Sequence, residues 1–188
     1  CGIADFKGRH YFAYHCGTLP GGSGFNRSTA IEQFEYNPDG SLPIILPTAK
    51  GPDPVGTLNP YSRVEAETIA WSEGLKTEPN AKTGIYVSDI HNGDYLQVRE
   101  VDFGKKSPSR LTVSVASALR GGTINVYSGG TDRQLIASVK VPPTGGWEEW
   151  KSVTVPLATP VTGVHDLTFA FSGQKGCKLF NFDFWKFD

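Results

Sequence analysis

Two glutamates placed two residues apart could hold a cation. Glu65 and Glu67 lie in segment 63–67, which alternates charged and small apolar residues. If this segment is a β-strand, both carboxylates point to the same face and repel each other unless a cation neutralises them. Asp183 lies on the last expected strand, which is often a neighbour of the first strand in a sandwich. We therefore expect a structural Ca²⁺ at these three carboxylates, with solvated surface glutamates as the alternative.

Trp147 is the tryptophan best placed to bind a ligand. It follows two glycines at 145–146, which indicates a loop or the start of a strand rather than a core. A flat aromatic face in a shallow site can stack on the apolar face of a sugar ring while polar neighbours hydrogen-bond the hydroxyls. The candidate neighbours, by residue type, are Tyr86, Glu78 and Asn181. The remaining tryptophans are expected to pack in the core: Trp71, Trp150 and Trp185.

Catalytic motifs are missing from the sequence. It contains no GxSxG, HExxH, phosphate-binding loop or EF-hand loop. His15 ends an aromatic segment and Arg27 borders a glycine-rich loop, places where such residues are more often structural than functional. Cleavage of a glycosidic bond needs two carboxyl groups about 5 to 10 Å apart, and no such pair can be assigned here. We expect no catalytic residue in this chain.

Short alternating segments separated by turn residues fill the C-terminal two thirds of the chain. They lie at 63–67, 95–99, 111–115, 123–127, 135–141, 150–155, 167–171 and 179–185. No window shows a helical period. This pattern predicts an all-β fold, a β-sandwich of the jelly-roll type, over residues 61–188.

The N-terminal part has fewer alternating segments. Segments 10–15 and 30–36 predict two strands, which bury too little surface to form a core alone. We expect residues 1–47 to pack on the sandwich, on a partner, or on a missing part of their own domain. Residues 48–60 are rich in proline and predict a linker.

Composition narrows the class of function. The 188 residues carry a net charge of −1, which offers no basic surface for nucleic acid or an anionic membrane. The apolar runs are too short to span a bilayer. Three cysteines, Cys1, Cys16 and Cys177, leave at least one unpaired or paired outside the chain. Because the chain starts at Cys1, we expect a processed or truncated product.

Residues 61–188 resemble a carbohydrate-binding module of family 6. The resemblance rests on these stretches: 63–67 (RVEAE), 89–95 (DIHNGDY), 101–104 (VDFG), 144–150 (TGGWEEW), 163–167 (GVHDL) and 179–185 (LFNFDFW). It implies a β-jelly roll with a structural calcium. It also implies a sugar site among the loops at one edge, often for xylan or related β-glycans.

The resemblance also assigns roles to single residues. It implies an aromatic clamp of Trp147 and Tyr86, with polar sugar contacts from Asn181 and Glu78. The implied calcium carboxylates are Glu67 and Asp183, with Glu65 as a further candidate. Asn181 and Asp183 are two residues apart on one expected strand, so their side chains should point to the same face. They can serve different sites only if Asn181 lies at the end of its strand.

Residues 1–47 resemble the final segment of a glycoside hydrolase family 43 domain, a five-bladed β-propeller. The resemblance rests on these stretches: 6–9 (FKGR), 11–15 (YFAYH), 19–28 (LPGGSGFNRS) and 36–40 (YNPDG). The resemblance implies that the catalytic carboxylates belong to earlier blades, outside this chain. It places His15 near the propeller centre and Arg27 near the substrate pocket. Cys16 stands where the pattern has asparagine.

These observations predict the C-terminal part of a secreted, extracellular hemicellulose-degrading hydrolase. The chain is expected to bind xylan, arabinoxylan or a related β-glycan without hydrolysing it. One alternative is a nicked arabinofuranosidase or xylosidase whose active site, with His15 and Arg27, is completed by a separate N-terminal propeller fragment. A second is a lectin-like adhesion domain, which leaves residues 1–47 unexplained.

Overall fold

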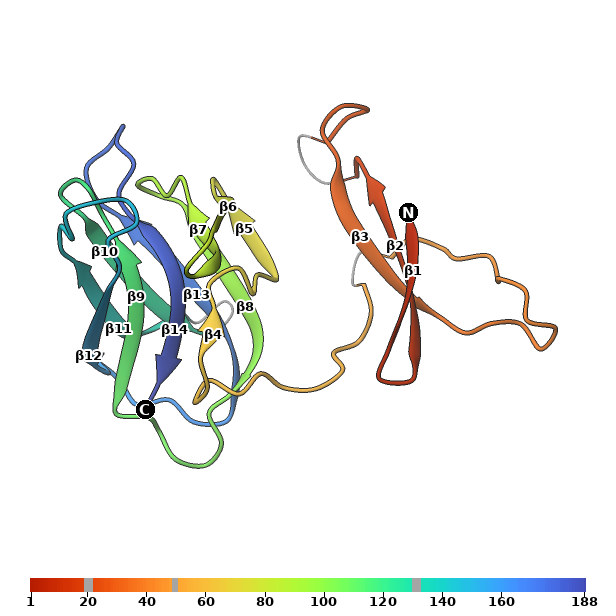
Figure 1. The fold of residues 1–188 in the computed structure, drawn as a ribbon. Helices are drawn as coiled ribbons and strands as arrows, with labels where there is room; N and C mark the ends of the chain where they lie inside the picture. The colour runs from red at the N-terminus through yellow and green to blue at the C-terminus, as the bar shows by residue number, and fades with distance from the viewer. Residues whose placement is uncertain (19–21, 49–50, 130–132) are drawn as a thin grey trace. The chain divides into compact units, whose positions relative to one another are not determined.

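The computed structural model describes residues 1–18, 22–48, 51–129 and 133–188 (Figure 1). The chain divides into two compact units, Cys1–Val55 and Gly56–Asp188. The division falls inside the proline-rich segment 48–60. All regular elements in the described ranges are β-strands, and none of these residues forms a helix long and apolar enough to cross a membrane.

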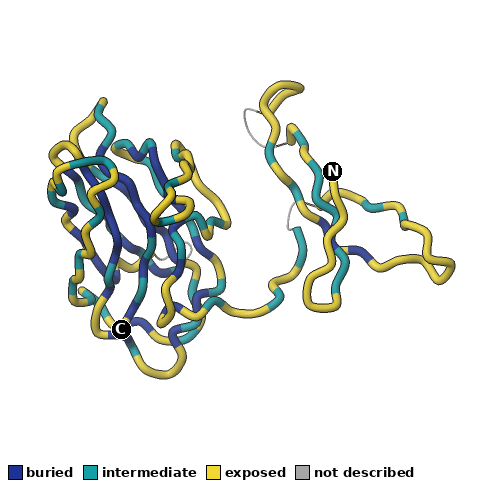
Figure 2. The backbone as a smooth tube through the Cα atoms, in the orientation of Figure 1, coloured by how far each residue is buried: buried dark blue, intermediate teal, exposed yellow. Residues whose placement is uncertain are grey.

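The N-terminal unit is a three-stranded antiparallel sheet in the order β1-β2-β3. Its strands are β1 (Gly2–Phe6), β2 (Arg9–Cys16) and β3 (Ser28–Phe34). The turn between β1 and β2 places Lys7 and Gly8 at positive φ, 49° and 73°, as a tight two-residue hairpin requires. Most of this unit is exposed or only half buried (Figure 2), so the sheet has no core of its own.

The C-terminal unit is a sandwich of two antiparallel sheets. One sheet has the order β11-β10-β13-β8-β5, and the other has the order β12-β9-β14-β7-β6 with β4 also paired to β14. The strands are β4 (Val64–Glu65), β5 (Trp71–Glu73), β6 (Lys76–Asn80), β7 (Gly84–Ser88), β8 (Tyr95–Asp102), β9 (Arg110–Ala116), β10 (Gly122–Ser128), β11 (Gln134–Val141), β12 (Lys151–Pro156), β13 (Val164–Ser172) and β14 (Asn181–Phe187). The predicted all-β sandwich is confirmed.

Aromatic side chains hold the two sheets together. Phe169 of β13 packs against Phe182 and Trp185 of β14, with ring centroids 5.8 and 5.3 Å apart. All three side chains are completely buried. Burial of a side chain of this size stabilises the fold by about 1.5–3 kcal/mol. The last strand therefore forms the centre of the core.

A β-bulge in β14 changes the facing of its residues. Phe182 pairs with Val115 and Phe184 pairs with Ser114, so Asp183 is an extra residue without its own partner on β9. Phe182 and Trp185 can both point into the core, although they are three residues apart, because the bulge shifts the alternation. The rule that residues two apart on a strand face the same side therefore does not apply to Asn181 and Asp183.

The region 63–88 differs from expectation in three ways. The first strand ends at Glu65, so Glu67 lies beyond it and the shared face of one strand does not exist. The strands β5, β6 and β7 were missed, and for β6 the reason is that its sequence, KTEPN, is polar and contains a proline, as edge strands do. Trp71 is 44% exposed rather than core, and its indole N–H donates to the Tyr95 hydroxyl at 3.1 Å.

Candidate functional site

Glu78 and Tyr86 face each other across β6 and β7. The Tyr86 hydroxyl donates to Glu78 Oε2 at 2.9 Å, and the Ser88 hydroxyl donates to Oε1 at 2.8 Å. These bonds, Ser88 first and then Tyr86, hold the pKa of Glu78 below its usual value. Burial, and then the neighbouring Glu78, raises the pKa of Tyr86 to about 12. The pair therefore presents an ionised, exposed carboxylate fixed in direction by two donors.

Trp147 lies in a turn whose geometry depends on Gly145, which has a φ of +106°. The indole is half buried. Asn181, the first residue of β14, donates its amide N–H to the Trp147 carbonyl at 2.7 Å. Asn181 is fully buried, and its Oδ1 has no hydrogen-bond partner among the described residues. Asn181 therefore fixes the turn that carries the tryptophan.

Lys178 connects these two parts of the site. Its ammonium group lies 4.7 Å from the centroid of the Trp147 ring, within range of a cation–π contact. Its charge also contributes to the lowered pKa of Glu78. Sequence analysis missed Lys178 because a single lysine ahead of the last strand carries no periodic or motif signal.

Tyr86 occupies a different position from that of an open aromatic clamp. Its side chain is only 3% exposed, and its ring packs edge-on against Trp150 with centroids 5.2 Å apart. The structure thus links Tyr86 to Glu78, and Asn181 to Trp147, with Lys178 between the two pairs. Within this cluster Glu78 is exposed, and Lys178 and Trp147 are half buried. A stacking role for Tyr86 remains a prediction.

The carboxylates expected to bind calcium surround an arginine that sequence analysis missed. The Arg63 guanidinium forms two hydrogen bonds with Glu65, at 2.7 and 2.9 Å, and lies 3.3 Å from Asp183 Oδ1. It also stacks on Phe184, 4.3 Å from the ring centroid. Within the described ranges, no three acidic, histidine or cysteine side chains form a group that could hold a metal as they stand.

Glu67 is the unsatisfied member of this cluster. Its Oε2 is buried and has no hydrogen-bond partner in the described part of the chain. Burial raises the pKa of Glu67, and the charges of Glu65 and Asp183 act in the same direction. Burial likewise raises the pKa of Asp183. Glu67 thus leaves a buried oxygen without a donor beside two other carboxylates, and a hard cation is the kind of group that would satisfy it.

The N-terminal unit brings His15 and Arg27 into contact. The Arg27 guanidinium meets Nε2 of His15, and its Nε–H donates to the Gly24 carbonyl at 3.0 Å. Both side chains are exposed. The three cysteines are free, and Cys16 contacts the hydroxyl of Thr18 at 3.2 Å.

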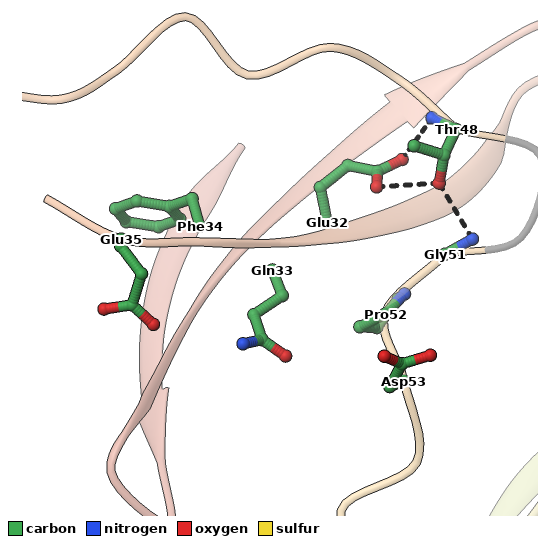
Figure 3. Close-up of a pocket in the computed structure, with 8 residues that line it drawn as sticks. All are labelled: Glu32, Gln33, Phe34, Glu35, Thr48, Gly51, Pro52 and Asp53. Atoms are coloured by element: carbon green, nitrogen blue, oxygen red, sulfur yellow. Dashed lines mark hydrogen bonds between the residues drawn. The ribbon is translucent and has the colours of Figure 1, made fainter.

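A hollow of about 430 Å³ in the same unit is lined by residues 32–35 at the end of β3 and by Thr48 and residues 51–53 (Figure 3). The Glu32 carboxylate accepts hydrogen bonds from the Thr48 backbone N–H at 2.6 Å and from its hydroxyl at 2.9 Å. The backbone bond is the main cause of the lowered pKa of Glu32. Because the buried carboxylate is saturated by Thr48 and by the Tyr14 hydroxyl, it anchors the start of the proline-rich segment to β3.

The C-terminal unit has the features of a β-sandwich module that binds glycans: a partly exposed tryptophan in a fixed turn, with charged and polar groups beside it. Residues 65–188 match the sequence pattern of the family described as "Carbohydrate binding module (family 6)". The chain belongs to this family of carbohydrate-binding modules. The predicted resemblance of the C-terminal unit is confirmed.

The comparisons extend into the N-terminal unit. The chain is 36% identical, over 98% of its length, to the arabinoxylan arabinofuranohydrolase of Bacillus subtilis (strain 168), and it spans 37% of that protein. A crystal structure of a glycoside hydrolase family 43 arabinoxylan arabinofuranohydrolase from B. subtilis with cellotetraose matches at a TM-score of 0.86 and 36% identity. That match covers 98% of this chain and 39% of the other. The expected similarity to family 43 is therefore confirmed, and the chain spans little more than a third of these relatives.

A solved family 6 module matches the sandwich alone. The module from Clostridium cellulolyticum, in complex with xylose, is 34% identical with a TM-score of 0.65. The match covers 70% of this chain and 99% of that module. The C-terminal unit therefore spans nearly the whole length of that solved module.

Proposed function

We propose that the C-terminal unit binds xylan, arabinoxylan or a related β-glycan, with Trp147 as the stacking surface. The main observation in support is the buried amide of Asn181, which holds the Trp147 turn beside the ionised carboxylate of Glu78. Glu78 offers a fixed acceptor and Lys178 a donor to the hydroxyls of a sugar ring stacked on the indole. Support for the substrate class comes from the names of the relatives, an arabinoxylan arabinofuranohydrolase and a module in complex with xylose.

Affinity electrophoresis in gels containing xylan, arabinoxylan, arabinan or β-glucan tests this function. We expect retardation by xylan or arabinoxylan, and its loss in Trp147→Ala. Trp71→Ala is the matched control, because Trp71 is an exposed tryptophan on β5 in the other sheet. Loss of retardation in Trp71→Ala with retention in Trp147→Ala would move the site to that sheet. No retardation in any gel would contradict the proposal.

We further propose that Ca²⁺ is a structural ion of this unit, bound by Glu67 and Asp183 with Glu65 nearby. The support is the unsatisfied buried oxygen of Glu67 next to two other acidic groups. The Ala66 backbone N–H already donates to the Asp183 carbonyl at 2.8 Å, so the ion would strengthen an existing junction between the end of β4 and β14. The ion would stabilise the fold and take no part in stacking.

For the whole protein, we propose a secreted, extracellular hemicellulose-degrading hydrolase in which this chain supplies glycan binding and no catalytic carboxylate. The favoured alternative is an active site completed in trans by a separate propeller fragment, supported by the contact between exposed His15 and Arg27. Native and denaturing mass spectrometry of the purified protein, with an aryl-arabinoside assay, separates the two. A larger co-purifying fragment with activity supports the alternative, and inactivity of a single species supports binding alone.

A further inference from the structure

A second hollow, of about 210 Å³, adjoins the Trp147 site. Residues 119–121, between β9 and β10, form one wall, and part of the segment between β13 and β14, including Gln174 and Lys178, forms the other. Lys178 also lies over the Trp147 ring, so the hollow and the proposed stacking surface share this side chain. The volume is below the roughly 300–1,000 Å³ of pockets for drug-sized ligands. It suits one substituent of a glycan rather than its main chain.

The lining of this hollow carries positive charge and no carboxylate. Arg120 is exposed and makes no hydrogen bond or ion pair with the described residues. Lys178 is half buried, and its charge acts on Glu78 and Asp89, which other donors already hold. Glu78 accepts bonds from Tyr86 and Ser88, and Asp89 pairs with Lys76 at 2.7 Å. Among the described residues, neither Arg120 nor Lys178 has an ion pair of its own, so both cations of the hollow can meet a ligand.

We propose that this hollow is a subsite for the carboxylate of a uronic acid substituent on the bound glycan. The inference rests on the proposed function, because the main chain must occupy Trp147 to place a substituent beside Lys178. The planar guanidinium of Arg120 can bind a carboxylate with two parallel hydrogen bonds, and the Lys178 ammonium adds a third donor. Gly121 on the first wall and Gln174 on the second add further polar groups to the lining. The site thus selects acidic over neutral decoration.

Isothermal titration calorimetry of the full chain with two matched ligands tests this inference. One ligand is a neutral xylo-oligosaccharide, and the other is the same oligosaccharide carrying one glucuronic acid. We expect the wild type to bind the acidic ligand roughly three- to tenfold more tightly at low salt, and the preference to shrink at high salt. Arg120→Ala and Lys178→Ala should each remove most of the preference. Lys175→Ala is the control, because Lys175 is an exposed lysine of the same segment that does not line the hollow.

The outcomes separate the two proposals. Equal affinity of the wild type for both ligands overturns the uronic acid subsite and leaves the proposed function intact. Binding of neither ligand overturns the proposed function and the subsite with it. A preference that survives both Arg120→Ala and Lys178→Ala, or that is lost equally in Lys175→Ala, overturns the assignment to this hollow. Unchanged melting temperatures confirm that each variant is folded.

Discussion

The side-chain amide of Asn181 donates a hydrogen bond to the backbone carbonyl of Trp147 at 2.7 Å, across 34 residues of sequence. This bond joins the first residue of β14 to the turn that carries the stacking surface. Asn181 is inaccessible to solvent, and the bond as a whole is partly buried. A buried donor that holds a carbonyl is costly to remove, because the carbonyl is then left without a partner. The rigidity of the site therefore depends on Asn181.

Asn181→Ala should lower both stability and binding. We expect a loss of about 1–3 kcal/mol in the free energy of unfolding, since the Trp147 carbonyl loses its donor. Binding of xylo-oligosaccharide should also weaken, because the tryptophan turn becomes mobile. Urea denaturation and calorimetric titration measure the two effects. Full stability with unchanged affinity would show that the bond does not position Trp147.

Trp147→Ala should separate binding from stability. The indole is half buried and has Lys178 as a ring contact, so its removal should change the melting temperature by only a few degrees. Binding of xylo-oligosaccharide should fall at least about tenfold, since stacking on the indole supplies the apolar contact. Differential scanning fluorimetry and titration calorimetry measure the two quantities. A large melting loss with retained binding would assign Trp147 to the core.

Local sequence signals predicted much of the fold and part of the site. Alternation of apolar and polar residues predicted the sandwich, because strands with one buried face must alternate. The two glycines before Trp147 predicted its turn, because a φ of +106° at Gly145 is accessible to glycine. These signals are properties of a few adjacent residues, which is why they can be detected in one sequence.

Features that depend on pairing between distant segments could not be predicted. The bulge at Asp183 exists because β14 and β9 align with one residue in excess, and nothing in the sequence of β14 indicates it. The ion pair between Arg63 and Asp183 likewise joins β14 to a residue 120 positions earlier. The position of Lys178 over Trp147 follows from the same kind of long-range packing. Sequence analysis thus identified the acidic and aromatic groups but missed the cations between them.

Glycan binding should be insensitive to pH over a wide range and fall only in acid. Hydrogen bonds from Ser88 and Tyr86 lower the pKa of Glu78 in the folded protein. The Glu78 carboxylate therefore stays ionised, and able to accept hydrogen bonds from sugar hydroxyls, until the pH falls below the ordinary pKa of a glutamic acid, about 4.3. We expect constant affinity from about pH 8 to 5 and a decline below about pH 4. Calorimetric titration across this range, with Glu78→Gln as the reference, provides the measurement.

Tyr86→Phe should raise the pKa of Glu78 toward its usual value. The substitution removes one of the two donors to the carboxylate and keeps the ring that packs against Trp150. An NMR titration of the Glu78 side chain should show an upward shift, and the acid limit of binding should move to higher pH. Ser88→Ala is the matched variant, which removes the other donor. A Glu78 pKa that is the same in all three proteins would contradict the role assigned to these hydrogen bonds.

Removal of calcium should destabilise the C-terminal unit while the Trp147 site keeps its structure. The buried Oε2 of Glu67 lacks a partner, and Glu65 and Asp183 add negative charge around it. An ion present at about 100 times its dissociation constant stabilises the folded state by about 2.7 kcal/mol, so EGTA should lower the melting temperature by roughly 5–10 °C. Glu67→Gln should melt at the lower temperature and no longer respond to EGTA, because the amide removes one charge from the ligand set. Glu73→Gln, which alters an exposed glutamate on β5, should retain the response to EGTA.

Equal melting curves of the wild type with Ca²⁺ and with EGTA would contradict the site. Loss of glycan binding in EGTA below the melting transition would instead place the ion in the sugar site, because a purely structural ion leaves a folded binding surface intact.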